Sequence, residues 1–431
     1  MHTIINPTEF GWAAGAVAAA VAFTCAPAAV GQDGPDRIRA SDPFLYISGE
    51  DAIPWAPLVE GDHLEGWSQI GGRAEYEVED GVVTGTAVPD TPNSFLATDA
   101  SYGDFILEYE FKVDSRLNSG VQIRSASDPD YKGGQVHGYQ VEIDPSDRAW
   151  TAGIYDEARR GWLAPLSGEG HAEARAAFRQ AEWNKVRVRA VADHIQTWLN
   201  DVPAADLVDP VTQEGFIALQ VHSIGDESLA GARVQWRNLR IRDLGKHVWR
   251  SVMKGNSLDG WTATPGGEWK LTDDGILLGT SPASEERHGI LLSDRTFSNF
   301  TVRFDFNVTA GNSGFYFRVK PTDHAVAVEG FQAEVDPTMA TGGLYETLGR
   351  AWVAQPDEGK LAEVYRPGEW SQMVVSAHEG RVAVFVNGLK TVELEDDPGL
   401  REGRLGFQLH GGQEMEVRFR DLEILSPSPK G

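Results

Sequence analysis

One stretch of this chain places three polar side chains of the kind that bind or transform hydroxyl-rich ligands at alternate positions. In Tyr139-Gln-Val-Glu-Ile-Asp144, the polar residues Gln140, Glu142 and Asp144 alternate with Val141 and Ile143. Because successive side chains of a β-strand point to opposite faces, residues two apart share a face. A carboxyl group in such a row is a candidate general acid or base, and a long amide can hold hydroxyl groups.

Two more stretches show the same alternation. Gln122 and Arg124 alternate with apolar residues in one of them, and Gln220 and His222 do so in the other. An arginine can stabilise developing negative charge, and a histidine titrates near neutral pH. The plain alternative is that these are the solvent faces of half-buried strands. Ordinary solvent faces favour Lys, Glu and Thr, however, so we expect a ligand-binding face.

The same pattern occurs a second time further along the chain. Tyrosines that follow a Gly-x pair, Tyr155 and Tyr345, add a candidate stacking surface for a sugar ring. The second set of polar residues consists of Tyr316 and Arg318, then Gln332, Glu334 and Asp336, then Gln408 and His410.

An internal duplication explains this recurrence. The stretch Trp55–Trp67 aligns without gaps on Trp249–Trp261, and the later landmarks follow in the same order. A repeat of this length indicates two complete domains in tandem and not a solenoid. We predict domains at residues 55–244 and 249–427, with a short linker at 245–248 and a tail at 32–54.

The elements that must position these residues are mostly strands. Apolar residues recur with a period of two in 105–113, 186–191 and 195–199, and in 301–306, 373–377 and 382–386 of the second copy. Many short strands with turns between them predict an all-β fold, a sandwich or jelly roll in each copy. One helix is expected within 171–180. The five tryptophans at repeat-equivalent or strand positions are expected in the core: Trp67, Trp183, Trp198, Trp261 and Trp370.

The N-terminus and the overall charge bear on location and partners. An apolar run at 12–24 is followed by small residues and predicts a signal peptide over 1–31, cleaved after Ala28 or Gly31. The protein would then be exported, periplasmic or extracellular, with no integral membrane domain after cleavage. The only cysteine, Cys25, lies within this segment. The net charge of -26 argues against nucleic acid and anionic lipid as partners.

Several kinds of chemistry lack a motif. There is no Gly-rich phosphate loop after a strand, no His-Glu-x-x-His and no cysteine cluster, so nucleotide-dependent, zincin and redox functions are unsupported. The acidic turn Asp144–Asp147 is a weak candidate for a hard cation such as Ca²⁺. Asp before Pro is commonest in plain turns.

The motifs together resemble one known family, the bacterial 3-keto-disaccharide hydrolase domain, which is associated with 3-keto-glucoside lyases and 3-keto-2-hydroxyglucal hydratases. The resemblance covers both copies and nearly all of the mature chain, and it implies two tandem concanavalin-A-like jelly rolls. It departs at the last motif, where the family often has Gln-Asp-His-Gly. The motifs that carry it are Leu-Glu-Gly-Trp67 and Leu-Asp-Gly-Trp261, Asn-Ser-Gly at 118 and 312, Gln-x-Glu-x-Asp ending at Asp144 and Asp336, Gly-x-Tyr at Tyr155 and Tyr345, Glu-Trp at 182 and 369, and Gln-x-His ending at His222 and His410.

The resemblance implies a specific reaction on an oxidised sugar. A ketone at C3 acidifies the C2 proton, so that a base can remove it and the C1 substituent can leave by β-elimination, and hydration then completes net hydrolysis. The expected catalytic roles are His222 or Glu142 as base, Arg124 as enolate stabiliser and Asp144 as orienter or metal ligand. The only cofactor considered is a divalent metal ion, which would take over the electrostatic role of Arg124.

In the first copy Gln122, Gln140, Tyr155 and Gln220 would hold the sugar. The second copy would use Arg318, Glu334, Asp336 and His410 for catalysis and Gln332, Tyr345 and Gln408 for binding. The expected partner is a 3-keto sugar or another carbohydrate.

Two other functions remain open at this point. Jelly rolls host lectins as readily as enzymes, so a non-catalytic carbohydrate-binding protein is the main alternative. In the other, one copy is active and its neighbour is a binding module, with the first copy favoured as the active one. A glycosidase that acts on unoxidised sugar is disfavoured, because it needs two carboxylates on opposite sides of the bond and Glu142 and Asp144 share one strand.

Overall fold

The computed structural model describes residues 49–225, 227–253 and 257–428, and nearly all of its regular structure is β-strand. The predicted signal peptide and most of the predicted tail lie outside the described residues. Among the described helices, none is long and apolar enough to cross a membrane. The short helices are two α-helices and three 3-10 helices: α1 (Ala172–Ala177), α2 (Glu358–Val364), η1 (Glu50–Ala52), η2 (Glu169–His171) and η3 (Glu227–Leu229). Helix α1 confirms the predicted helix within 171–180.

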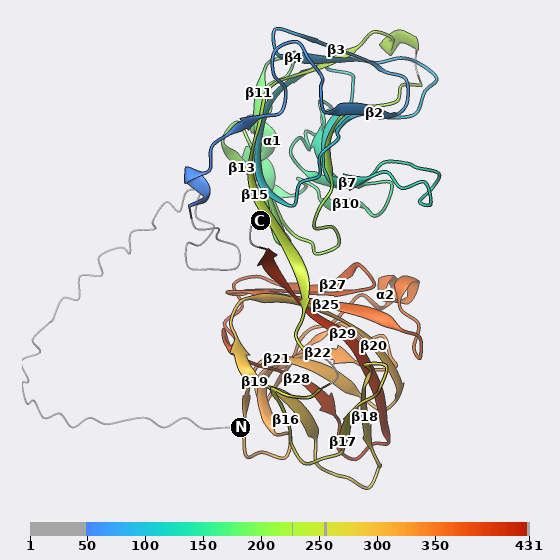
Figure 1. Cartoon of the computed structure of the whole chain (residues 1–431), viewed down its shortest axis with the longest axis vertical. Helices are drawn as coiled ribbons and strands as arrows, with labels where there is room; N and C mark the ends of the chain where they lie inside the picture. The colour runs from blue at the N-terminus through green and yellow to red at the C-terminus, as the bar shows by residue number, and fades with distance from the viewer. Residues whose placement is uncertain (1–48, 226, 254–256, 429–431) are drawn as a thin grey trace, which may run out of the picture. The chain divides into compact units, whose positions relative to one another are not determined.

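Each copy contains a seven-stranded antiparallel sheet (Figure 1). In the first copy the order is β10-β9-β8-β7-β14-β5-β2, and in the second it is β16-β19-β28-β21-β22-β23-β24. The strands of the first are β2 (Trp67–Gly71), β5 (Ser94–Thr98), β7 (Ser119–Ala126), β8 (His137–Ile143), β9 (Ile154–Glu157), β10 (Gly161–Ala164) and β14 (Phe216–Val221). The strands of the second are β16 (Trp261–Ala263), β19 (Gly289–Phe297), β21 (Ser313–Pro321), β22 (Val328–Val335), β23 (Leu344–Thr347), β24 (Ala351–Ala354) and β28 (Gly403–Leu409).

The remaining strands form the opposing layer of each copy and are joined into one 15-stranded sheet. Those of the first copy are β1 (Ala56–Pro57), β3 (Glu75–Glu79), β4 (Val82–Thr86), β6 (Asp104–Val113), β11 (Asn184–Val191), β12 (His194–Leu199), β13 (Val202–Val208) and β15 (Arg233–Ser251). Those of the second copy are β17 (Glu268–Leu271), β18 (Leu277–Ser281), β20 (Phe300–Ala310), β25 (Ser371–His378), β26 (Arg381–Val386), β27 (Leu389–Leu394) and β29 (Met415–Ser428). The fold is therefore all-β, with two tandem sandwiches of two sheets each, as predicted.

The two sheets of each copy enclose a separate apolar core. Trp67 and Trp261 belong to these cores, as predicted. The prediction was wrong for Trp183 and Trp370, which are only half-buried and lie outside both cores. Each instead carries an arginine over its ring, with the guanidinium carbon 4.1 and 4.2 Å from the ring centroid. An indole can cover an arginine at the surface as well as fill a core.

The predicted linker is part of a strand. In β15, residues 233–245 pair with β4 and β6 of the first copy, and Lys246–Ser251 pair with β29 of the second. The last strand of one copy thus continues directly into the first strand of the next. Figure 1 shows β15 in yellow-green.

The face of each seven-stranded sheet that points away from the core carries the polar rows predicted from the sequence. In the first copy Val121, Val141 and Leu219 point into the core, and their polar neighbours point outward. This outer face is not a solvent face, because Val136, from the segment between β7 and β8, packs there against Phe95, Ala97 and Ala218. The polar side chains Gln122, Gln140 and Gln220 are at most 2% exposed, so they do not form an ordinary solvent face.

Candidate functional site

Strand register builds one continuous row across the outer face of the first copy. Gln122 on β7 pairs with Gln140 on β8, which pairs with Tyr155 on β9, which pairs with Trp162 on β10. The Gln122 amide donates to the Gln140 carbonyl oxygen at 2.7 Å and accepts from the Ser125 hydroxyl at 2.7 Å. The predicted binding residues Gln122, Gln140 and Tyr155 thus lie together.

Glu142 lies beside this row in a cradle of amide donors. Asn118 Nδ2 donates to its Oε1 at 2.7 Å, and Gln140 Nε2 donates to its Oε2 at 2.9 Å. The carboxyl is only 5% exposed. Burial raises the pKa of Glu142 and the nearby Asp144 adds to the rise, whereas the two amides and Arg148 act to lower it. A buried carboxyl with a raised pKa is suited to acid–base catalysis.

The second copy repeats the cradle around Glu334. Asn312 Nδ2 donates to Glu334 Oε1, and Gln332 Nε2 donates to Oε2 at 3.1 Å. Burial, assisted by the charge of Asp336, raises the pKa of Glu334 to about 8. At neutral pH this carboxyl is therefore mostly protonated and can donate a proton.

A hydrogen-bonded chain leads from Glu334 to a pair of histidines. Gln332 Nε2 also donates to Gln408 Oε1 at 3.1 Å, and Gln408 Nε2 lies 2.9 Å from Tyr316 Oη and 3.3 Å from His288 Nδ1. The His288 and His410 rings lie 4.3 Å apart between centroids. Burial, followed by the charge of His410, lowers the pKa of His288 to about 4.

Gln220, the first-copy counterpart of Gln408, lacks such partners. Its side chain is fully buried, and neither its amide nitrogen nor its oxygen has a hydrogen-bond partner within the described residues. The difference follows from the sequence, because Gln122 occupies the position of Tyr316 and Asn93 that of His288. An unpaired buried amide is costly, so a ligand hydroxyl or a water would be held strongly at this point.

The histidines at the end of the last motif adopt the same arrangement in both copies. Nδ1 of His222 lies 2.7 Å from the Ser223 carbonyl, and Nδ1 of His410 lies 2.7 Å from the Gly411 carbonyl. A carbonyl oxygen can only accept, so Nδ1 of His222 carries the hydrogen. In a neutral ring Nε2 of His222 is then a free base. Nδ1 of His410 also lies 3.1 Å from the amide nitrogen of Gln413, which is a donor.

The structure does not bring Arg124 and Arg318 to this face. Both residues have a positive φ, 45° and 52°, at a β-bulge that breaks the alternation of side chains. Arg124 is fully buried and donates to the Gly103 and Ala192 carbonyls and to Asp104. Arg318 likewise binds the carbonyls of Ser298 and Glu379. The prediction that Gln122 and Arg124 share a face was wrong, and both arginines tie strand ends together.

Asp144 and Asp336 each hold the turn that follows their strand. Asp144 accepts hydrogen bonds from Ser146 Oγ at 2.6 Å, from Arg148 Nε at 2.8 Å and from the Trp150 amide at 3.2 Å. These bonds outweigh burial and lower the pKa of Asp144. Asp336 accepts from Thr338 Oγ1 at 2.6 Å. These contacts assign both aspartates a positioning role in the turn.

Sequence reasoning missed several residues of the site. Asn118 and Asn312 belong to the repeated Asn-Ser-Gly motif, and that repetition was the signal for their role. Glu157, whose Oε1 accepts from Asn93 Nδ2 at 3.3 Å, adds a second carboxyl to the first copy only. Burial raises its pKa, and Asn93 and the charge of His222 offset only part of this rise. Within the described residues, no group of three or more His, Cys, Asp or Glu side chains is arranged to hold a metal ion.

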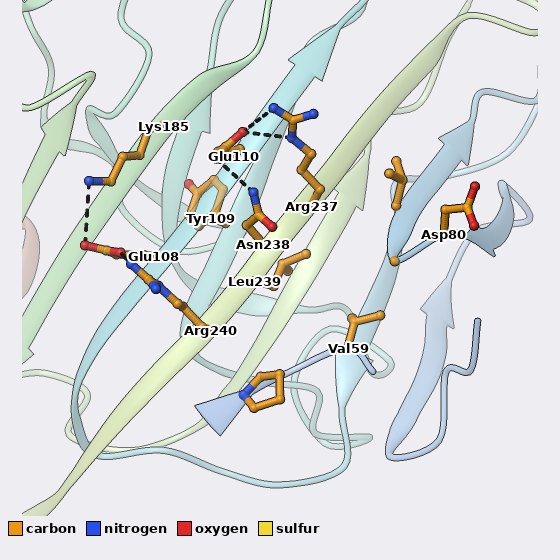
Figure 2. Close-up of a pocket in the computed structure, with 13 residues that line it drawn as sticks. Val59, Asp80, Glu108, Tyr109, Glu110, Lys185, Arg237, Asn238, Leu239 and Arg240 are labelled. Carbon is orange, nitrogen blue, oxygen red and sulfur yellow. Dashed lines mark hydrogen bonds and ion pairs between the residues drawn. The ribbon is translucent and has the colours of Figure 1, made fainter. Parts of the chain in front are cut away.

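A pocket of about 700 Å³ lies elsewhere, against β6 and β15 (Figure 2). Four of its charged groups form two pairs: Arg237 Nε donates to Glu110 at 2.8 Å and Arg240 Nε to Glu108 at 3.0 Å. The pair of Glu108 on β6 and Arg240 on β15 recurs in the second copy with the charges exchanged. There the arginine, Arg303, lies on β20 and the glutamate, Glu423, lies on β29. This pairing indicates a structural role for the charges, so the outer face of the seven-stranded sheet is the better candidate site.

Comparison with known proteins bears on both copies. The profile of a family described as the 3-keto-alpha-glucoside-1,2-lyase-like domain matches residues 54–242 and again 248–425. Among curated proteins, none matches this chain.

Three solved structures illustrate the similar folds. A protein of Parabacteroides distasonis, provisionally assigned to the glycosyl hydrolases, is 18% identical over 46% of this chain and 98% of its own, with a TM-score of 0.33. The carbohydrate-binding module CBM66 of Bacillus subtilis is 19% identical over 42% of this chain and 100% of its own, with a TM-score of 0.31. A Bacillus subtilis protein of unknown function with a galectin-like fold is 17% identical over 43% and 100%, with a TM-score of 0.30.

Proposed function

Since this chain belongs to the 3-keto-alpha-glucoside-1,2-lyase-like family through both of its copies, we propose that it cleaves 3-keto-glycosides by β-elimination, hydration or both. The observation that carries this proposal is the cradled glutamate, Glu142 or Glu334, which is buried on the outer face of the sheet in both copies. Conversion of an oxidised sugar needs an acid, a base and a donor for the enolate oxygen, and this face offers a residue type for each.

The proton transfers are assigned as follows. Nε2 of His222 or His410 removes the proton at C2, whose acidity comes from the neighbouring C3 ketone. The electron pair forms the C1–C2 double bond and the bond from C1 to the aglycone oxygen breaks. Glu334, mostly protonated because burial raises its pKa to about 8, gives its proton to the departing oxygen. Glu142, whose pKa burial also raises, takes this part in the first copy. Addition of water to the resulting glucal completes net hydrolysis.

Charge on the C3 oxygen is stabilised by neutral donors. In the first copy the free amide of Gln220 is the assigned donor, and in the second copy it is the hydroxyl of Tyr316, which already accepts from Gln408 and Thr347. Gln140 and Gln332 hold sugar hydroxyls and orient the glutamate. The scheme uses protein side chains alone, and Arg124 and Arg318 have no part in it. Export to the periplasm or the medium belongs to the same proposal.

The test incubates the mature protein with a 3-keto-glucoside and with the parent glucoside, with and without added divalent metal ion. Aglycone release and enone absorbance are followed. Release from the keto sugar alone supports the proposal. Loss of turnover on adding a chelator would assign a metal role that the scheme lacks.

Variants at the glutamates separate the two copies. Glu142→Gln and Glu334→Gln should each remove the turnover of one copy, and the double variant should lose at least about 100-fold, in the range of general acid–base catalysis. Full turnover in the double variant would contradict the acid role. Sugar binding without any turnover in the wild type would favour a carbohydrate-binding protein, which the unpaired amide of Gln220 also suits.

A further inference from the structure

The edge of the outer face in the second copy ends in an aromatic pair. Gln332 pairs across the sheet with Tyr345, which pairs with Trp352 on the last strand, β24. The two rings pack edge to face at 5.5 Å between centroids. Because Gln332 also bonds Glu334, the aromatic pair continues the row that starts at the cradled glutamate.

The repeated Gly-x-Tyr motif explains how the indole is seated. A Cβ built on Gly343 would lie 2.8 Å from Trp352 Cζ3, and one on Gly153 would lie 3.3 Å from Trp162 Cζ3. Absence of a side chain at the glycine therefore lets the tryptophan ring lie against the backbone beside the glutamate strand. The sequence pattern thus builds an aromatic platform in both copies, formed by Tyr155 and Trp162 in the first and by Tyr345 and Trp352 in the second.

Only the second copy leaves its platform open. Trp352 is 41% exposed, one of three large apolar side chains so exposed among the described residues. In the first copy the Arg148 guanidinium lies 5.0 Å from the ring centroid of Trp162 and 4.7 Å from that of Trp150, held there by Asp144. The turn after Asp336 is two residues shorter and has neither the arginine nor the tryptophan.

We propose that Trp352 stacks against the sugar ring on the leaving-group side of a glycoside held at Glu334. The second copy would then prefer glycosides whose leaving group is itself a neutral sugar. An exposed indole next to a row of amides and a carboxyl matches a pyranose, which has apolar faces and a hydroxyl-bearing edge. A sugar ring that carries a carboxylate is disfavoured, because β22 and the residue after it present the carboxyls of Glu334 and Asp336. In the first copy Arg148 occupies the corresponding position.

The inference rests on the proposed function, but one readout of its test, sugar binding, does not depend on turnover. In a Glu142→Gln background, which silences the first copy, the kinetics of Trp352→Ala and Trp352→Phe are compared on a 3-keto-glucose disaccharide and on methyl 3-keto-glucoside. Trp352→Ala should raise KM for the disaccharide at least about fivefold more than for the methyl glycoside, the scale expected for truncating an anchoring tryptophan. Trp352→Phe should keep most of the selectivity. An equal effect on both substrates would overturn the inference.

Binding of the unoxidised disaccharide, measured by calorimetry, separates this inference from the reaction. If no substrate is turned over, a weaker affinity in Trp352→Ala still supports the platform, whereas an unchanged affinity overturns it. Trp162→Ala is the matched control and should change the affinity less, because Arg148 already covers that ring. If the wild type binds neither the unoxidised disaccharide nor the 3-keto-glucose disaccharide, both the platform and the proposed function are overturned.

Discussion

At the scale of single residues, the same side chains meet different environments in the two copies. Glu142 and Glu334 have matching amide partners, but Arg148 offsets the charge of Asp144 near Glu142, and no arginine occupies the matching place near Glu334. The carboxyl of Asp336 adds to burial in raising the pKa of Glu334 to about 8, and Asp144 acts on Glu142 in the same direction. The charge of Arg148 thus acts to lower the pKa of Glu142, and within the described residues no such charge acts on Glu334.

This raised pKa predicts a pH dependence of stability. A carboxyl with an ordinary pKa of 4.5 when unfolded and about 8 when folded binds more protons in the folded state between these values. The contribution of this carboxyl to the free energy of unfolding is therefore complete below about pH 4.5 and falls as the pH rises toward 8. The loss is on the order of 4 kcal/mol, at about 1.4 kcal/mol per pKa unit.

Glu334→Gln removes this ionisation and should flatten the decline. Thermal or denaturant unfolding at pH 5 and pH 8 would be compared for the wild type and the variant, with Asp305→Asn as a control at a carboxyl that is paired with Arg420. A decline in Glu334→Gln as steep as in the wild type would mean that another group is responsible.

At the scale of elements, bulges decide which way side chains point. Those at Arg124 and Arg318 turn the arginines inward, and a bulge in β15 between Arg237 and Arg240 places Asn238 at a φ of 52°. At this last site Glu108 and Arg240 form an ion pair (Figure 2). The equivalent strands of the second copy carry Arg303 and Glu423. The arginine also covers a tryptophan in each copy, Trp55 in the first and Trp249 in the second.

The exchanged pair predicts a double-mutant cycle. Glu108→Arg alone or Arg240→Glu alone should destabilise the protein by about 1 to 2 kcal/mol, because each puts like charges together at a partly buried site. The double variant should recover most of this loss, because it has the arrangement of the second copy, with the arginine on the first of the two strands and the glutamate on the second. Chemical denaturation measures the coupling, and strictly additive losses would contradict a direct pair.

At the scale of the whole molecule, the copies are fused through one strand. Residues 246–251 of β15 pair with β29 just as β1 pairs with the earlier part of β15. The amides of this segment should therefore exchange with solvent at least about 100-fold more slowly than in an unfolded chain, as expected for a paired strand. Hydrogen exchange with mass spectrometry on a peptide covering 245–251 tests this. Exchange at the unfolded rate would mean that this segment is an unpaired linker between the copies.

The sequence by itself determined the duplication, the strands and the polar rows. Local alternation placed Gln140 beside Glu142 and Gln332 beside Glu334, because residues two apart on one strand share a face whatever the rest of the chain does. The family could also be inferred from the sequence, because its motifs lie in order along each copy.

Only the tertiary structure decided how these rows are completed. The inward turn of Arg124, the unpaired amide of Gln220, the bond from Asn118 to Glu142 and the stacking of Arg148 on Trp162 depend on strands and turns that lie apart in the sequence. A bulge or a two-residue difference in a turn shifts these contacts without changing the local pattern. The chemistry of each face is therefore set by cross-strand register, which no single segment encodes.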